Sequence, residues 1–276
     1  MPSKATFYSV LTDAINDLAE HGYDSAERVA QWTEAIREAA NAMLVSPRAM
    51  DRMLREGLVS IYKRMVDNGE IVKYHPGIPR FTIDRLKHSM RSELDRRLMA
   101  SADLINLNRE ASVQRTIQRF QGWATSIPKG GSDAVRKTET KKELRKALAS
   151  LPFEERRVII DQGHKLVASI SEIIANDGGA LAGVWHSNWR QRNYNYREDH
   201  KERDGEVYVL RGNWALRAGL MKAGRAGYYD KITSVGEEVF CRCYMIFLYH
   251  LRSLPTDMIT ERGRQKLKEA QEAIAS

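Results

Sequence analysis

The residues best suited to chemistry in this chain of 276 residues lie in two short segments. Its only two cysteines, Cys241 and Cys243, are separated by one arginine, and the charged run 197–204 lies upstream and contains His200. An imidazole and two thiolates are ligands that zinc binds in proteins, so the two segments together could form a metal site. The carboxylates beside His200 could instead hold a hydrolytic cation, as in a metal-dependent nuclease.

The two cysteines lie within an apolar run that predicts a β-strand. Residues 239–249 are rich in aromatic and β-branched side chains. On a strand, Cys241 and Cys243 point to the same face with Cα atoms about 6.5–7 Å apart, at the limit of disulfide geometry. We therefore expect two free thiols that share a neighbour, with Arg242 on the opposite face. The candidate ion-pair partners of that arginine are Glu198, Glu202 and Glu206.

The role of His200, Cys241 and Cys243 stays open between a zinc site and a packed joint. Structural zinc sites usually use Cys-x2–4-Cys pairs, which a Cys-x-Cys pair matches imperfectly. The sequence therefore favours no cofactor, with the thiols packed as small hydrophobes and His200 hydrogen-bonded to the backbone, and zinc as the alternative. The candidate fourth ligands are Asp199, Asp204, His186 and water.

Enzyme chemistry has little support in the sequence. Four acids within residues 198–204 are typical of a solvated charge cluster. The chain contains no Gly-x-Ser-x-Gly elbow, Walker loop or Gly-x-Gly-x-x-Gly phosphate cradle. We therefore expect a protein that is not an enzyme.

Composition predicts a soluble protein without a disulfide scaffold. Hydrophobic residues make up 42% of the chain, no apolar run is long enough to span a membrane, and no signal-peptide block follows the N-terminus. Two cysteines in this length fit a reducing compartment, or a particle assembled in one.

Positive charge is concentrated in two regions. The net charge is +8, and residues 84–157 carry 17 basic and 10 acidic side chains, while residues 185–225 carry 9 and 5. Such regions could contact nucleic acid, and the alternative is a set of solvated helix faces. Residues 185–197 also interleave aromatic rings with cations, which could stack bases, although cation–π anchoring of a loop is favoured. The candidate nucleic-acid contacts are Arg96, Arg97, Lys141, Lys142, Arg190 and Arg192.

The hydrophobic pattern predicts an α+β protein, with a mainly α-helical N-terminal region followed by a small C-terminal α+β module. Apolar residues at helical spacing predict helices over 7–18, 29–43 and 46–65, a long helix from about 82 to 123 with one interruption, and a last helix from Pro152 to about 178. Strands are expected at 206–210 and 239–249, and a charged helix at 260–275. We expect three parts: a helical assembly region 1–178, an α+β module 179–255 and a charged helix 256–276.

The order of the chemically capable residues resembles a known family. The string Arg197-Glu198-Asp199-His200, then Asp204-Gly205, then a terminal Cys-Arg-Cys, resembles the bacteriophage Mu F-like family of minor head proteins, also called phage head morphogenesis proteins. The resemblance covers residues 180–250, and Phe240 stands where the family usually has Asn. The residues that carry the signature are Arg197, Asp199, His200, Gly205, Cys241, Arg242 and Cys243.

The resemblance implies a non-catalytic virion protein of a tailed phage. Such proteins assemble in the host cytoplasm with the portal and the major capsid protein, in several copies per particle, and lie inside the head near the portal. DNA binding and a role in genome ejection are implicated in some relatives, so packaged double-stranded DNA is a possible partner. The competing interpretation is a DNA-binding or DNA-processing enzyme with a His/Cys/carboxylate metal centre.

Overall fold

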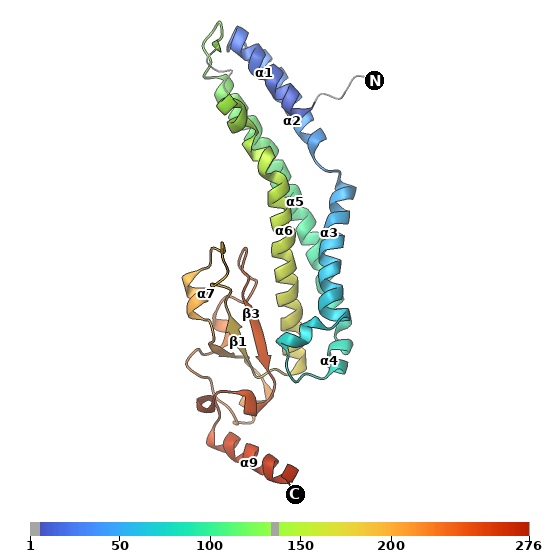
Figure 1. The fold of residues 1–276 in the computed structure, drawn as a ribbon, viewed down its shortest axis with the longest axis vertical. Coiled ribbons are helices and arrows are strands. Elements are labelled where there is room, and N and C mark those ends of the chain that lie inside the picture. Colours follow the sequence, from blue (N-terminus) through green and yellow to red (C-terminus); the bar gives the residue numbers. More distant parts are fainter. Residues whose placement is uncertain (1–5, 134–137, 276) are drawn as a thin grey trace. The chain divides into compact units, whose positions relative to one another are not determined.

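A computed structural model describes residues 6–133 and 138–275 of the chain (Figure 1). The fold is α+β, as the sequence predicts: long helices precede a small antiparallel sheet near the C-terminus. The chain forms two compact units, each made of two stretches. Met1–Leu54 and Ala100–Val158 form the helical unit, and Arg55–Met99 and Ile159–Ser276 form the sheet unit. Within the described residues, no helix has the length and apolar character needed to cross a membrane.

The helical unit is built on amphipathic helices. Helices α1 (Phe7–His21) and α2 (Ala26–Met43) begin where the hydroxyls of Thr6 and Ser25 accept backbone hydrogen bonds, as good N-caps do. Parts of α5 (Lys87–Ala124) and α6 (Thr138–Gly178) complete the unit. The predicted apolar stripes are confirmed as its core, which includes Leu11, Leu18, Ile36, Ile117, Phe120 and Leu148.

Helix α6 begins earlier than the sequence predicts. It starts at Thr138 and passes through Pro152, where a helix start was expected. A proline removes one hydrogen bond from a helix interior. Here the buried face continues across it from Leu148 and Leu151 to Val158, so apolar packing outweighs the lost bond. The predicted end is confirmed, because Gly179 follows Gly178 with φ +76° in the left-handed region that favours glycine.

The predicted helix start at Ser46-Pro47 and the break before residue 80 are confirmed. Helix α3 (Pro47–Tyr62) begins with the Ser46 hydroxyl accepting from the Ala49 N–H. It leads into a π-helical turn η1 (Lys63–Asp67) and a 3-10 turn η2 (Glu70–Tyr74). Helix α4 (Arg80–Arg85) and helix α5 follow, separated at Leu86, which is the predicted interruption.

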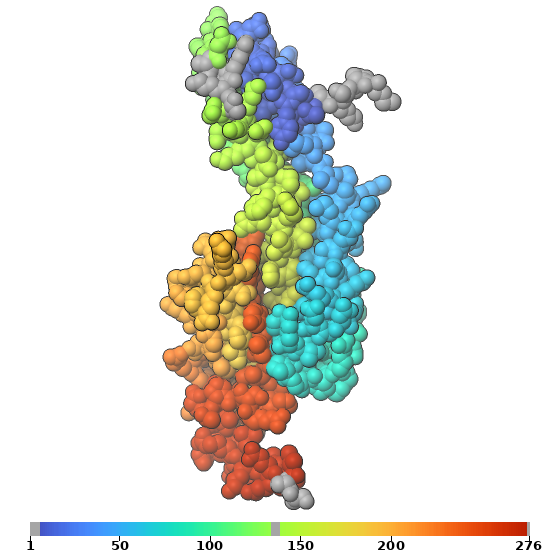
Figure 2. Space-filling model, in the orientation of Figure 1, coloured from blue at the N-terminus to red at the C-terminus, as the bar shows by residue number. Residues whose placement is uncertain are grey.

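The sheet has three antiparallel strands in the order β2-β1-β3. Strand β1 (Ala182–His186) lies in the centre, with β2 (Val207–Val209) and β3 (Tyr244–Leu248) on either side. Short elements connect and extend them. These are α7 (Glu198–Glu202), α8 (Trp214–Arg217), η4 (Tyr229–Lys231), η5 (Leu251–Ser253), η6 (Thr256–Met258) and α9 (Glu261–Ala275). Much of α9 is exposed, including Ile274 at 87% (red in Figure 2).

The strand that was expected over 239–249 is shorter in the structure. Strand β3 begins at Tyr244, and both cysteines precede it. The physical reason is a turn: the Cys241 N–H donates to the Glu238 carbonyl, and Phe240 has φ +60°. A residue with that φ cannot continue a strand.

The two units divide the chain differently from the three parts expected from the sequence. The expected boundary at 178 lies inside the sheet unit, because α6 carries polar anchors for the sheet module. Asp161 accepts from the Phe240 N–H at 2.6 Å, and Glu172 accepts from the Tyr229 hydroxyl at 2.8 Å. The helix expected over 256–276 also belongs to this unit, and Leu267 of α9 packs against its core.

Candidate metal centre and the signature residues

His200, Cys241 and Cys243 meet in the interior of the sheet unit. His200 comes from α7, and the two cysteines come from the turn before β3. The His200 Nδ1 atom lies 3.7 Å from the Cys241 Sγ atom and 3.5 Å from the Cys243 Sγ atom. The exposed fractions are 1% for His200, 1% for Cys241 and 7% for Cys243. The expectation that both thiols face one neighbour is therefore confirmed, and that neighbour is the imidazole.

The spacing of these atoms fits tetrahedral zinc. Zn–S bonds of about 2.3 Å and Zn–N bonds of about 2.0–2.1 Å place a sulfur and a nitrogen about 3.6 Å apart on a tetrahedron. The two measured separations, 3.5 and 3.7 Å, lie on either side of this value. All three ligand atoms lie within 4.8 Å of one another. The cluster could therefore hold a zinc ion with small adjustments.

The second nitrogen of His200 faces acidic groups. Its Nε2 atom lies 3.9 Å from the Asp199 Oδ2 atom and 3.8 Å from the Glu238 Oε2 atom, too far for a hydrogen bond. The atom is buried without a hydrogen-bond partner in the described part of the chain. The backbone hydrogen bond expected for His200 is therefore wrong, because one nitrogen faces sulfur and the other faces carboxylates. A nearby carboxylate is also the usual neighbour of the second nitrogen of a metal-binding histidine.

The pKa values of the two thiols are shifted in opposite directions. A hydrogen bond from Cys243 lowers the pKa of Cys241, although burial opposes the shift, and the Gly236 N–H and His200 assist it. The same bond raises the pKa of Cys243, and burial raises it further. One thiolate is therefore favoured over two in the absence of a cation, and a bound cation would favour the second ionisation.

None of the side chains proposed from the sequence as a fourth ligand joins the group of described residues. Asp199 faces the second nitrogen of His200 and pairs with Arg203. Asp204 instead accepts from the Ser187 N–H and from the Trp189 Nε1 atom, at 2.9 and 3.0 Å. His186 stacks on Tyr244 with ring centroids 5.0 Å apart. Among the described histidines, cysteines and acids, only three residues form the group, which leaves water as the remaining candidate.

The other signature residues hold the cluster in place. The Arg197 Nη2 atom donates to the Val239 carbonyl at 3.0 Å, and its guanidinium pairs with Glu238, so α7 is tied to the turn that carries the cysteines. Gly205 has φ +84°, and its N–H donates to the Trp185 carbonyl at 2.8 Å. That conformation favours glycine and links the segment after α7 to β1.

Asp199, the acidic signature residue, takes part in a set of contacts around the indole ring of Trp185. It pairs with Arg203 at 2.7 Å, and the Arg203 guanidinium lies 5.1 Å from the Trp185 ring centroid. Trp185 packs edge-on against His200, with ring centroids 5.4 Å apart. His200, and Asp199 through Arg203, are therefore placed around the buried Trp185 ring.

The expected carboxylate partners of Arg242 are wrong. Its Nη1 atom donates to the Gln191 Oε1 atom at 3.1 Å, and its guanidinium lies 5.1 Å from the Tyr194 ring centroid. The Tyr194 hydroxyl in turn accepts from the Arg242 N–H and donates to the Phe240 carbonyl. Arg242 is thus directed to the loop before α7, because the turn at Phe240 replaces the expected strand.

Three acids of the 198–204 run have separate partners. Glu198 pairs with Lys201 at 3.2 Å, Asp199 pairs with Arg203, and Asp204 accepts the two hydrogen bonds from the loop after β1 described above. Lys201 also lies 5.4 Å from the ring centroids of both Trp189 and Tyr196. The carboxylates therefore do not converge on one cation position among the described residues.

The candidate nucleic-acid contacts are dispersed. Arg190 is exposed and lies over the Trp189 ring at 4.7 Å, and Arg192 is also exposed. Arg96 and Arg97 both pair with Glu93, which neutralises part of their charge. Lys141 and Lys142 belong to the helical unit, whereas the four arginines belong to the sheet unit. Nucleic-acid contact by these residues stays a prediction.

Sequence reasoning missed several residues that support the site. Tyr194 and Asp161 bond to the turn that carries the cysteines, and the Asn188 side chain donates to the Arg242 carbonyl at 2.6 Å. Glu238 could have been found, because it lies just before the Cys-Arg-Cys motif and opposes Arg197 in charge. Asp161 lies 79 positions from its partner on a helix, so no local signal marks it.

Comparisons of this chain with protein-family models, with curated proteins and with solved structures found no match.

Proposed function

We propose that this chain is a non-catalytic minor head protein of a tailed bacteriophage, which associates with the portal and the capsid interior during head morphogenesis. The observation that carries the proposal is that the signature residues make direct contacts. His200 meets both cysteines, and Arg197 bonds to the turn that holds them. A motif spread over forty-odd positions, whose histidine and cysteines meet in the interior and whose arginine bonds to their turn, has the character of a structural signature.

Burial supports a structural role for the thiols over a reactive one. A catalytic cysteine needs access to a substrate, whereas Cys241 and Cys243 are 1% and 7% exposed. Three acids of the neighbouring run, Glu198, Asp199 and Asp204, are each engaged by a cation or an N–H group. In this proposal the sheet unit presents a fixed surface to its assembly partners, and packaged DNA is a possible further contact of the basic side chains.

Co-assembly with the portal tests this function. The chain would be co-expressed with the portal protein of the same phage genome, and portal rings would be purified by an affinity tag on the portal. We expect the chain to co-purify at a fixed ratio and to appear on the rings by electron microscopy. A folded chain that never co-purifies with portal or capsid protein would contradict the proposal.

A zinc ion in the same module is our second proposal, and the specific observation in its favour is the spacing of the ligand atoms. Two S–N separations that match a zinc tetrahedron, together with a histidine nitrogen facing carboxylates, are the arrangement that a zinc site needs. The ion would be structural, joining α7 to the turn before β3. Water completes the coordination in this proposal.

Metal analysis of the purified protein tests the zinc proposal. We expect about one zinc per chain in the native protein, as for a single structural site, and almost none in Cys243→Ser. The matched control is His186→Gln, which changes a histidine outside the group and should leave zinc bound. Native protein that folds without metal, and gains no stability when zinc is added, would contradict it.

A further inference from the structure

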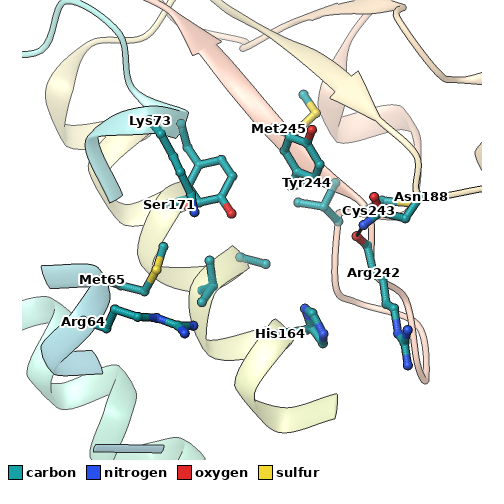
Figure 3. Close-up of a pocket in the computed structure, with 14 residues that line it drawn as sticks. Arg64, Met65, Lys73, His164, Ser171, Asn188, Arg242, Cys243, Tyr244 and Met245 are labelled. Carbon is teal, nitrogen blue, oxygen red and sulfur yellow. Dashed lines mark hydrogen bonds between the residues drawn. The ribbon is translucent and has the colours of Figure 1, made fainter. Parts of the chain in front are cut away.

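A second recess in the sheet unit combines positive charge with aromatic side chains. The cavity has a volume of about 220 Å³ and is lined by residues from stretches far apart in the sequence (Figure 3). Arg64 and Lys73 come from η1 and η2, His164 comes from α6, and Arg242 and Tyr244 come from the start of β3 and the turn before it. In Figure 3, His164 lies between the η1–η2 side and the β3 side. The cavity borders the cysteine cluster through Cys243 but involves different side chains.

The lining is strongly cationic. Arg64, Lys73 and Arg242 contribute three positive charges, and none of the described residues that line the cavity is an Asp or a Glu. The nearest ion-pair partner of the first two is a single carboxylate, Glu70, at 3.6 and 3.8 Å. These separations exceed hydrogen-bond distance, so the cations keep donors for another acceptor. The guanidinium of Arg242 donates to the neutral side chain of Gln191.

His164 responds to the positive field of the cavity. Burial lowers its pKa, and the nearby Arg242 guanidinium lowers it further, while Asp161 opposes the shift. A neutral imidazole at neutral pH can donate one hydrogen bond and accept another. The cavity is thus lined by cations and by a neutral donor.

Aromatic rings and hydroxyls complete the lining. Tyr74 and Tyr244 lie with ring centroids 5.5 Å apart at an interplanar angle of 59°, and Ser171 adds a hydroxyl from α6. Arginine and lysine side chains bind phosphate oxygens through charge-assisted hydrogen bonds, and tyrosine rings contact the flat face of an attached base. A lining that carries cations and no carboxylates favours an anion with several oxygens over a neutral ligand.

We propose that this cavity binds a phosphate group, either free or carried on a molecule no larger than a mononucleotide, through Arg64, Lys73, His164 and Arg242. The volume admits a compact anion and excludes a DNA duplex, whose width of about 20 Å exceeds the recess and whose groove alone is about 12 Å wide. The inference does not depend on the proposed head function, because it rests on the charges that line the cavity, although Arg242 also belongs to the signature.

Titration of the full-length protein tests the proposal, with three probes: inorganic phosphate, deoxyadenosine 5′-monophosphate and a short single-stranded DNA without a terminal phosphate. We expect saturable binding of inorganic phosphate or of the mononucleotide by calorimetry. Tighter binding of the mononucleotide would identify an organic phosphate as the ligand, and equal affinity would identify the phosphate group alone.

Charge-matched variants locate the binding. Replacing two charge-assisted donors in Arg64→Gln/Lys73→Gln should weaken binding at least about tenfold. Arg217→Gln/Lys222→Gln removes the same charge from exposed positions of the same unit and should leave affinity within about twofold. The single variant Arg64→Lys keeps both positive charges and should bind more tightly than Arg64→Gln/Lys73→Gln. An unchanged melting temperature would show that the variants remain folded.

Three results would overturn the proposal. The first is no saturable binding of inorganic phosphate or the mononucleotide. The second is an equal loss in the cavity pair and in the Arg217→Gln/Lys222→Gln pair. The third is binding of the short DNA alone, weakened by salt and unaffected by the cavity variants, which would indicate contact with a basic surface elsewhere. The co-purification test with the portal is independent of all three.

Discussion

The helical unit and the sheet unit are stabilised by different kinds of contact. In the helical unit, aliphatic stripes such as Leu11, Ile36 and Leu148 form a continuous apolar core. In the sheet unit, a second small apolar core is accompanied by polar contacts between distant segments, including those of His200 and Asp161. Apolar packing depends mainly on volume and pattern, whereas polar contacts depend on particular atoms. The helical unit also has a buried ion pair, Arg109–Glu155, beside its apolar core, whereas the imidazole and thiol cluster lies in the sheet unit, where few substitutions preserve its contacts.

Removal of a bound metal should give the largest difference between the units. If zinc joins His200 to the cysteines, chelation should destabilise the sheet unit by several kcal/mol. This is less than the apparent zinc-binding free energy of zinc-finger peptides, ~10–16 kcal/mol, because packing also stabilises this fold. The fluorescence of Trp185, which packs on His200, should change. Trp32 and Trp123 of the helical unit should not respond. Equal destabilisation of both units, followed with single-tryptophan variants, would contradict the prediction.

A cavity in the helical core should give the next largest effect. Leu148→Ala removes a side chain that is 1% exposed and should lower the free energy of unfolding by about 3 kcal/mol. The matched control is Leu107→Ala on α5, because Leu107 is 62% exposed and should change stability by less than about 0.5 kcal/mol. Denaturant unfolding followed by Trp32 and Trp123 fluorescence measures both. Similar losses of unfolding free energy in the two variants would show that Leu148 does not belong to the core.

Acid should weaken the sheet unit through His75. This side chain is fully buried, stacks on Phe247 and meets the Tyr249 hydroxyl at 2.7 Å, and burial lowers its pKa to about 3. Because the ordinary pKa is about 6.5, only the unfolded chain gains a proton as the pH falls from about 6.5 towards 3. Stability is therefore complete above pH 6.5 and decreases by at most about 1.4 kcal/mol per pH unit below it.

The His75 contribution is measured as a difference between variants, since carboxylates also titrate in this range. His75→Gln should be less stable than the native chain at pH 7 and should show a shallower decrease between pH 6.5 and 4.5. His21→Gln changes an exposed histidine of the helical unit and should retain the native slope. An unchanged slope in His75→Gln would mean that His75 is protonated in the folded chain.

The smallest predicted effect concerns the turn before the cysteines. Phe240 has φ +60°, a conformation that Asn adopts more readily than a bulky aromatic residue. Phe240→Asn should therefore relieve backbone strain and stabilise the sheet unit by about 0.5–1 kcal/mol. Val239→Asn, at an exposed neighbour without positive φ, should be neutral or slightly destabilising. A destabilised Phe240→Asn variant would show that the ring makes a contact that outweighs the backbone strain.

Periodic features of the fold could be predicted from the sequence, and contacts between distant segments could not. The stripes of α1 and α2 and the helix start at Pro47 follow from local spacing. Pro152 misled the prediction because local propensity disfavours what the buried face of α6 enforces. The sequence correctly predicted that the thiols of Cys241 and Cys243 share a neighbour. The reason it gave, a strand over 239–249, is wrong at these positions, because the turn at Phe240 shortens the strand. Tyr194 supports that turn from 46 positions away, and no sequence period marks such a contact.

The central claim is that this chain is a structural component of a phage head. Quantitative mass spectrometry of heads purified from the phage that encodes it tests this most directly, with asymmetric electron cryomicroscopy of the same particles to locate it. We predict several copies per particle, inside the head and near the portal vertex. Absence of the chain from heads that contain portal and major capsid protein, with the chain present only in the soluble host fraction, would contradict the claim.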